Sequence, residues 1–154
     1  MQASDLHSGD LLYWRGRGVW AWLVRTFTRS DYSHVAVFWL NGSQPTFIDS
    51  TPKAGVRATS LCFDPPQWAQ KTHTAWTPAI QLAVLKKEFT PYSFVDAFLS
   101  FCGLPARARG YMCAELAVFI LEQGGWNFKG VNPTPVGLAK AVERATQYTV
   151  VPFQ

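Results

Sequence analysis

An Asn-Gly pair at positions 41 and 42 separates two apolar runs, and it constrains the fold of this chain more than any other feature. The first run, residues 35–40, reads VAVFWL, and the second contains Phe47 and Ile48. Asparagine and glycine accept the left-handed backbone that a tight hairpin turn requires, so this pair is a strong hairpin signal. We therefore predict that the two runs are neighbouring antiparallel strands.

Further helix and strand signals lie on both sides of this hairpin. Strands are predicted for residues 11–14, 55–61, 79–85 and, at an edge, 148–151, with a loop over residues 64–76. Helices are predicted for residues 19–28, from about residue 90 to Gly103, from Cys113 to Gly124, and from Thr134 to residue 145. No linker or repeat divides the chain. The pattern predicts one α+β domain over residues 1–154, with a small, mostly antiparallel sheet and flanking helices.

Charge and cysteine content exclude several classes of function. The net charge of +4 comes without a run of like charges, and no nucleic-acid-binding motif appears, so no nucleic-acid partner is expected. The three cysteines form no CxxC or Cys/His cluster. The lack of such a cluster predicts no zinc site. The odd number and irregular spacing of the cysteines predict no disulfide framework, so a reducing compartment is the default.

The N-terminal region bears on the location of the chain. Residues 1–5 lack the basic and apolar segments of a signal peptide. The apolar stretch at residues 19–24 is too short to cross a bilayer and runs into Arg25. We predict an amphipathic helix laid against the core there, and no transmembrane segment. A cytoplasmic location is the default expectation, with phage association or release by lysis as the alternative.

A candidate nucleophile, Cys113, stands at the start of the predicted helix that contains the apolar run AVFIL. The unpaired N–H groups and the positive dipole end of a helix favour a thiolate over a thiol. His34 heads the strand at residues 35–40, and Asp49 ends the next strand. A thiol, an imidazole and a carboxylate on separate elements suggest a nucleophile, its base and an acid that orients the base.

Structural roles are the alternatives for these residues. Cysteine is among the most buried residue types, so Cys113 could fill the core, as Cys62 and Cys102 are predicted to do. Asp49 could cap the turn that follows it. Glu115 lies in the first turn of the helix, where its charge complements the dipole, so helix stabilisation is its expected role.

Five pieces of sequence, in order along the chain, carry a resemblance to a known family. They are Gly9-Asp10-Leu11, Ser33-His34-Val35, Ile48-Asp49 leading to Gly55-Val56, Pro91-Tyr92-Ser93-Phe94, and Tyr111-Met112-Cys113-Ala114-Glu115-Leu116. Together they resemble the permuted papain-like amidases of the NlpC/P60 superfamily, in the YiiX/YaeF-like branch. The resemblance covers about residues 9–140 and implies a circularly permuted papain-like fold, in which histidine and acid precede the cysteine.

The resemblance also implies roles for single residues. Cys113 takes the position of the nucleophile, His34 that of the base, and Asp49 that of the third polar residue, where many relatives have glutamate. The family's usual serine after the cysteine is Ala114 here, so an oxyanion contact at that point must come from backbone N–H groups. Contacts with substrate are expected from Ser33, Arg109 and Tyr111.

The function favoured by these residues is a cysteine hydrolase that cleaves an amide through a thioester. The expected substrate is a peptide or isopeptide bond in peptidoglycan stem peptides, with no metal or cofactor. An alternative is an acyltransferase or lipid deacylase of the lecithin:retinol acyltransferase type. Those relatives have asparagine before the cysteine and histidine two residues after it, whereas Met112 and Glu115 flank this cysteine.

Two more alternatives stay open at this point. A non-catalytic binding module or phage structural protein could keep the fold without the chemistry. A deamidating or cross-linking effector that acts on protein glutamine would use the same thioester chemistry.

Overall fold

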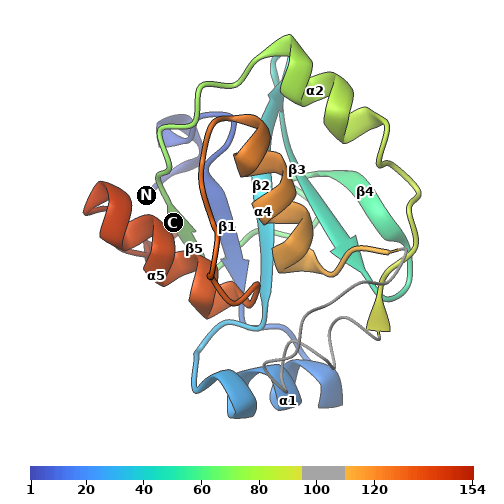
Figure 1. Cartoon of the computed structure of the whole chain (residues 1–154), viewed down its shortest axis with the longest axis vertical. Helices are drawn as coiled ribbons and strands as arrows, with labels where there is room; N and C mark the ends of the chain where they lie inside the picture. The colour runs from blue at the N-terminus through green and yellow to red at the C-terminus, as the bar shows by residue number, and fades with distance from the viewer. Residues whose placement is uncertain (95–109) are drawn as a thin grey trace.

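An antiparallel sheet forms the centre of the molecule (Figure 1). The computed structural model describes residues 1–94 and 110–154. In these two ranges the sheet has six strands in the order β4-β3-β2-β1-β5-β6. They are β1 (Leu11–Trp14), β2 (His34–Asn41), β3 (Gln44–Thr51), β4 (Gly55–Ser60), β5 (Trp68–Gln70) and β6 (Val151–Pro152). The predicted α+β class with a mostly antiparallel sheet is confirmed.

Two successive tight turns join β2, β3 and β4. Asn41 pairs with Gln44 across the first turn, where Gly42 has a φ of 63°. This is the left-handed backbone that the Asn-Gly signal predicts. The second turn is closed by Thr51 opposite Gly55. The chain thus returns twice in quick succession and aligns residues of all three strands.

Helices cover one face of the sheet. They are α2 (Pro78–Leu85), α4 (Cys113–Gln123) and α5 (Pro135–Thr146), with α4 across the middle of the sheet (Figure 1). Ile80, Leu116, Ile120 and Leu138 of these helices pack in one buried cluster with Val37 of β2. Burial of each such side chain stabilises the fold by about 1.5–3 kcal/mol. The cluster therefore fixes α4 against the strands.

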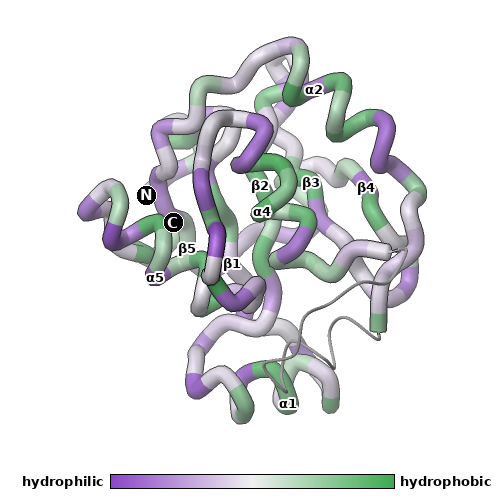
Figure 2. Tube along the Cα trace, in the orientation of Figure 1, coloured by the Kyte–Doolittle hydropathy of each residue, from purple (hydrophilic) through white to green (hydrophobic). Residues whose placement is uncertain are grey.

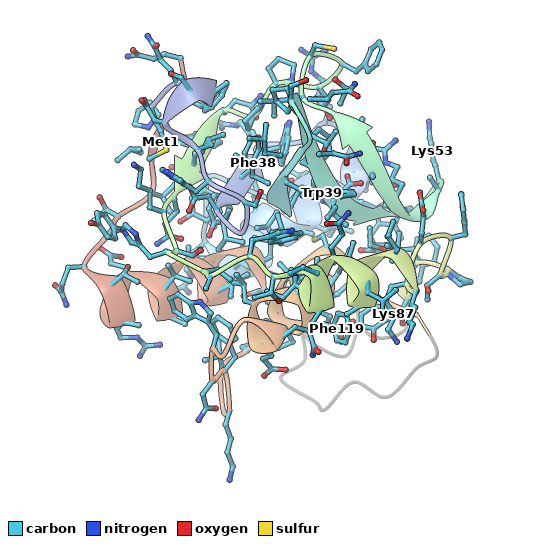
Figure 3. The ribbon with its side chains drawn as sticks, turned by 90° about the horizontal axis from the view of Figure 1, so that it is seen from above. Met1, Phe38, Trp39, Lys53, Lys87 and Phe119 are labelled. Carbon is cyan, nitrogen blue, oxygen red and sulfur yellow. The ribbon has the colours of Figure 1, made fainter. Side chains whose placement is uncertain are left out.

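The opposite face of the sheet carries a smaller core. Phe38 and Phe47 lie in this second cluster with Leu12, whereas Trp39 belongs to the larger one. Phe38 and Trp39 are neighbours on β2, so they point to opposite faces, as Figure 3 shows from above. Met1 and Phe153 pack on the smaller cluster, which brings the two chain ends together there.

The prediction of a strand over residues 79–85 is wrong, because this segment is helix α2. Thr77 caps the helix: its hydroxyl oxygen accepts from the Ile80 N–H at 3.3 Å, and Pro78 occupies the first turn. The nearly continuous apolar run of the segment is compatible with a buried strand, but the Thr-Pro start signal outweighs it. The same signal at Thr134 correctly predicts α5.

Other expectations need smaller corrections. Residues 68–70 form β5 within the predicted loop, and the last strand is confined to Val151–Pro152. Cys62 is exposed rather than packed in the core. Helix α1 (Val19–Thr28) forms as predicted, but none of its residues is buried. Residues 95–109, which include Cys102, Arg109 and most of the helix predicted near residue 90, lie outside the described residues.

None of the described helices combines the length and the apolar character needed to cross a membrane.

Candidate active site

Cys113 is the first residue of α4, and its side chain is buried. Met112, just before it, has an extended backbone, and its N–H donates to the Glu115 carboxylate at 3.1 Å. This contact satisfies one N–H group of the helix start, so Glu115 has the helix-stabilising role predicted for it. The thiol therefore sits at the positive end of a capped helix, where an anion is stabilised.

Hydrogen bonds from the sheet hold the segment that leads into α4. The Ser50 hydroxyl on β3 donates to the Tyr111 carbonyl at 2.6 Å, and the Tyr111 N–H donates to the Pro91 carbonyl at 3.1 Å. Gly110 allows the close approach, because a Cβ there would lie 2.6 Å from the Pro91 carbonyl oxygen. Cys113 is thus tied to β3 as well as to its own helix.

His34 connects the thiol to a carboxylate. It is the first residue of β2, its side chain is 23% exposed, and its Nε2 lies 2.9 Å from Asp49 Oδ2. Cys113 lies close enough to His34 for its charge and a side-chain interaction to raise the pKa of the ring, and Nδ1 is the ring nitrogen that Asp49 leaves available. The structure therefore brings together the three residues proposed from the sequence, with the imidazole between sulfur and carboxylate.

Arg57 is a fourth member of this group that the sequence analysis missed. It lies directly opposite Asp49 in the β3–β4 ladder. Its Nε donates to Asp49 Oδ1 at 3.0 Å and its Nη2 to Oδ2 at 3.4 Å. The signal was present in the sequence, because a tight turn after Thr51 aligns these oppositely charged residues on adjacent strands.

The charges of the group reinforce one another. Burial by itself would lower the pKa of His34, but the Cys113 thiolate and the hydrogen bonds to Asp49 and Cys113 raise it to about 10. Burial would raise the pKa of Asp49, but His34 and Arg57 hold it below its usual 3.8. His34 therefore lies between Cys113 and a carboxylate whose pKa is lowered, with the Arg57 guanidinium on the outer side of that carboxylate, and this arrangement favours the protonated ring.

Tyr92 lies close enough to Cys113 to feel its charge. Burial, and then the charges of Cys113 and Glu115, raise the pKa of Tyr92 well above its usual 10. The raised pKa favours the protonated phenol, whose O–H can act as a donor. The sequence motif that contains Tyr92 was noted, but its hydroxyl was given no role.

A cleft of about 850 Å³ opens beside His34. Its other lining residues are Trp14, Arg15, Gly16, Arg17, Asp64 and Gln67. The Trp14 and His34 rings are 5.6 Å apart between centroids. The cleft thus reaches His34, although Cys113 is not among its lining residues, and it has both positive and negative side chains on its walls.

Two of the residues expected to contact substrate, Ser33 and Tyr111, have other partners in the fold. The Ser33 hydroxyl donates to the Arg15 carbonyl at 2.7 Å and so holds the wall of the cleft. The Tyr111 ring packs 5.7 Å from that of Phe119, and Lys87 lies over both rings (Figure 3). Arg109 lies outside the described residues. A substrate contact by any of the three stays a prediction.

Comparison with known proteins identifies a shared fold. No protein-family model and no curated protein matches the chain. Among solved structures, the chain is similar to the metalloprotein YiiX from Escherichia coli O157:H7, with a TM-score of 0.68 and 15% sequence identity. The match covers 96% of this chain and 97% of YiiX. At this level of identity the similarity establishes a YiiX-like fold.

Proposed function

We propose that this chain, acting as one domain, is a cysteine hydrolase with Cys113 as nucleophile, His34 as base and Asp49 as orienting acid. The observation that carries the proposal is the double contact of His34, with the Cys113 thiol on one side and the buried Asp49 carboxylate on the other. This is the arrangement that a thiolate–imidazolium pair requires. It also agrees with the resemblance to permuted papain-like amidases of the NlpC/P60 superfamily.

The proposed reaction has two stages. The Cys113 thiolate attacks the carbonyl carbon, and the His34 imidazolium gives its proton to the departing amine, which leaves a thioester. Neutral His34 then takes a proton from water as the water attacks the thioester. The carboxylic acid product departs. Cys113 is then again a thiolate, and His34, which holds the proton taken from water, is again an imidazolium. Asp49 holds the ring orientation and balances its positive charge in both stages.

Two donors are suited to the oxyanion that forms in each stage. One is the backbone N–H of Cys113, at the positive end of α4. The other is the Tyr92 hydroxyl, whose pKa is raised by burial and then by the charges of Cys113 and Glu115, which favours the form that can donate. The side chain of Ala114 has no donor, so Tyr92 is the side chain that we propose for this role.

A metal is not part of the proposal, although the protein with the similar fold is called a metalloprotein. In the described ranges no group of three His, Cys, Asp or Glu side chains is arranged to hold a metal ion. The Asp49 carboxylate already accepts two hydrogen bonds from Arg57 and one contact from His34. A cation beside Asp49 would have to displace the guanidinium, so this donor set does not fit a metal.

The substrate that we propose is an amide of a peptidoglycan stem peptide or a related isopeptide. The cleft has the size of a typical small-ligand site, and a short peptide with free carboxylates would meet Arg15 and Arg17 on its wall. The test is incubation with purified muropeptides and separation of the products. New amine and carboxylate ends that appear with the wild type and not with Cys113→Ser support the proposal.

A lipid acyl ester or acyl-transfer substrate is the second candidate, and a specific observation favours it. Helix α1, which follows the cleft residues Arg15 and Arg17, exposes Trp20 and Trp22. An acyl chain could lie along these rings. A panel of lipid esters tested beside the muropeptides separates the candidates, because each predicts Cys113-dependent product from only one of the two panels.

A further inference from the structure

Helix α1 turns its apolar face outward. Its half-buried residues lie at positions 21, 23, 24, 25 and 28; all except residue 23 recur at one-turn spacing, so this side faces the protein. The other side carries Val19, Trp20 and Trp22, which are 73%, 57% and 56% exposed. A surface helix ordinarily has the reverse arrangement, with the apolar stripe on the core.

The helix is nevertheless firmly attached. Arg25 donates to the carbonyl groups of Arg15 and Gly16 and so joins α1 to the loop after β1. Trp20 also contacts Phe94, with ring centroids 5.9 Å apart. The outward face is therefore a fixed feature of the fold at the end of the sheet where β2 begins (Figure 1). Figure 2 shows apolar residues on this helix, beyond the sheet and the helices that cover it.

Positive charge surrounds the apolar face. Residues 11–30 contain four arginines, at positions 15, 17, 25 and 29, and no acidic residue. Arg17 and Arg29 are exposed at the two ends of α1. The acidic residue nearest to α1 in the sequence is Asp31. The acidic residue that lines the cleft is Asp64. The surface thus combines tryptophans with cations, which matches a bilayer interface with anionic head groups.

We propose that α1 docks this protein on the surface of an anionic lipid bilayer, with Val19, Trp20 and Trp22 in the interface and Arg17 and Arg29 among the lipid phosphates. Ten residues give a helix about 15 Å long, which lies along a surface and does not cross it. Arg15 and Arg17 also line the cleft, so docking brings the cleft mouth close to the membrane. The proposal is independent of the hydrolase chemistry, since it rests on α1 and on the arginines at its two ends.

Vesicle co-sedimentation of the full chain tests the proposal. Vesicles of phosphatidylcholine with 30% phosphatidylserine are compared with vesicles of pure phosphatidylcholine at low salt. The two exposed arginines predict partition into the anionic vesicles that is stronger by about 10- to 100-fold. Half-molar salt should remove most of this difference, because it screens the exposed charges.

Matched variants separate the helix from the rest of the surface. Trp20→Gln with Trp22→Gln should lower the partition at least about tenfold, because the apolar anchor is lost. The control is Phe63→Gln with Leu82→Gln, which removes two exposed apolar side chains elsewhere and should bind like the wild type. Arg17→Gln with Arg29→Gln should reduce binding to anionic vesicles only, and Lys53→Gln with Lys129→Gln should not.

Circular dichroism and the unfolding midpoint establish that each variant is folded before it is tested. The proposal is overturned if the wild type fails to sediment with anionic vesicles, or if the tryptophan variant binds like the control variant. It is also overturned if the protein without vesicles is a dimer that the tryptophan substitutions dissociate. In that case the face serves a second copy of the chain.

Discussion

Asp49 and Arg57 face each other across the β3–β4 ladder and are joined by two hydrogen bonds, at 3.0 and 3.4 Å. The carboxylate that contacts His34 is therefore already paired with a cation on its other side. Burial would raise the pKa of Asp49, but His34 and then this pairing with Arg57 hold the pKa below its usual value. The pairing also limits how far Asp49 can move toward or away from the imidazole.

The reactivity of Cys113 is the first prediction. Iodoacetamide near neutral pH should label Cys113 at least about tenfold faster than Cys62, because a thiolate paired with His34 reacts and a thiol does not. Mass spectrometry of peptides from briefly labelled protein gives both rates. Cys62 is exposed and Cys113 buried, so access alone predicts the opposite order. Equal labelling of the cysteines would count against the hydrolase.

Substitutions of the base and the acid should differ in severity. His34→Ala should remove nearly all turnover, as Cys113→Ser does, since both the thiolate and the proton transfers depend on the imidazole. Asp49→Asn should retain measurable activity, with a loss of about 10- to 1000-fold, because it only orients and balances the ring. Wild-type rates in Asp49→Ala across the pH range would remove Asp49 from the site.

Loss of the Arg57 charge should move the acid limit of activity. Arg57→Gln removes a positive charge that lowers the pKa of Asp49, so this pKa rises and the carboxylate is protonated at a higher pH. The acid side of the pH–rate profile should shift upward. Arg57→Lys should shift it less, because the charge remains. An unchanged profile in Arg57→Gln would show that the ion pair has no influence on the reaction.

The protonation of His34 can be followed directly by NMR. With a pKa of about 10, the ring should remain an imidazolium at pH 8, where an unfolded histidine is neutral. The contribution of protonated His34 to the free energy of unfolding is complete below about pH 6.5, and it is lost as the pH rises through about 10. In Cys113→Ala the pKa should fall, because the thiolate charge is gone. A ring that titrates near pH 6.5 in the wild type would contradict the ion pair.

Gly55, the first residue of β4, should tolerate no side chain. Gly55 has a φ of 65°, and a Cβ there would lie 2.2 Å from the Thr90 carbonyl oxygen. Gly55→Ala should therefore lower the free energy of unfolding by more than the about 1–2 kcal/mol of left-handed strain. Gly42→Ala is the matched control, since Gly42 has a φ of 63° with open space around it. Chemical denaturation measures both, and equal losses would exclude the predicted clash.

The part of the site formed by neighbouring strands, with His34, Asp49 and Arg57, was largely predictable from the sequence. The Asn-Gly turn fixes the register of β2 against β3 and so brings His34 near Asp49. The register of β4, which places Arg57, follows from the next tight turn in the same way. These contacts depend on short loops whose geometry is set by a few residues.

The position of Cys113 beside His34 could be predicted only from the resemblance to a known family. The contact of Cys113 with His34 depends on how α4 packs across the sheet, which no local pattern specifies. The outward face of α1 was also missed, because periodicity shows that a helix is amphipathic but not which side the protein covers. The apolar run of α2 is compatible with the repeat of a helix and with that of a strand, and the cap at Thr77 favours the helix.

The strand meander β2–β3–β4 has a consequence for how the protein is made. His34 and Asp49 are only 15 residues apart in the chain, and Asp49 and Arg57 only 8. Such short loops close quickly, whereas the sulfur arrives from a helix much later in the chain. During synthesis His34, Asp49 and Arg57 can thus assemble first, and Cys113 meets His34 only when α4 docks. We expect a chain still on the ribosome to carry an ordinary, unreactive cysteine, so that the proposed chemistry would begin only with the finished fold.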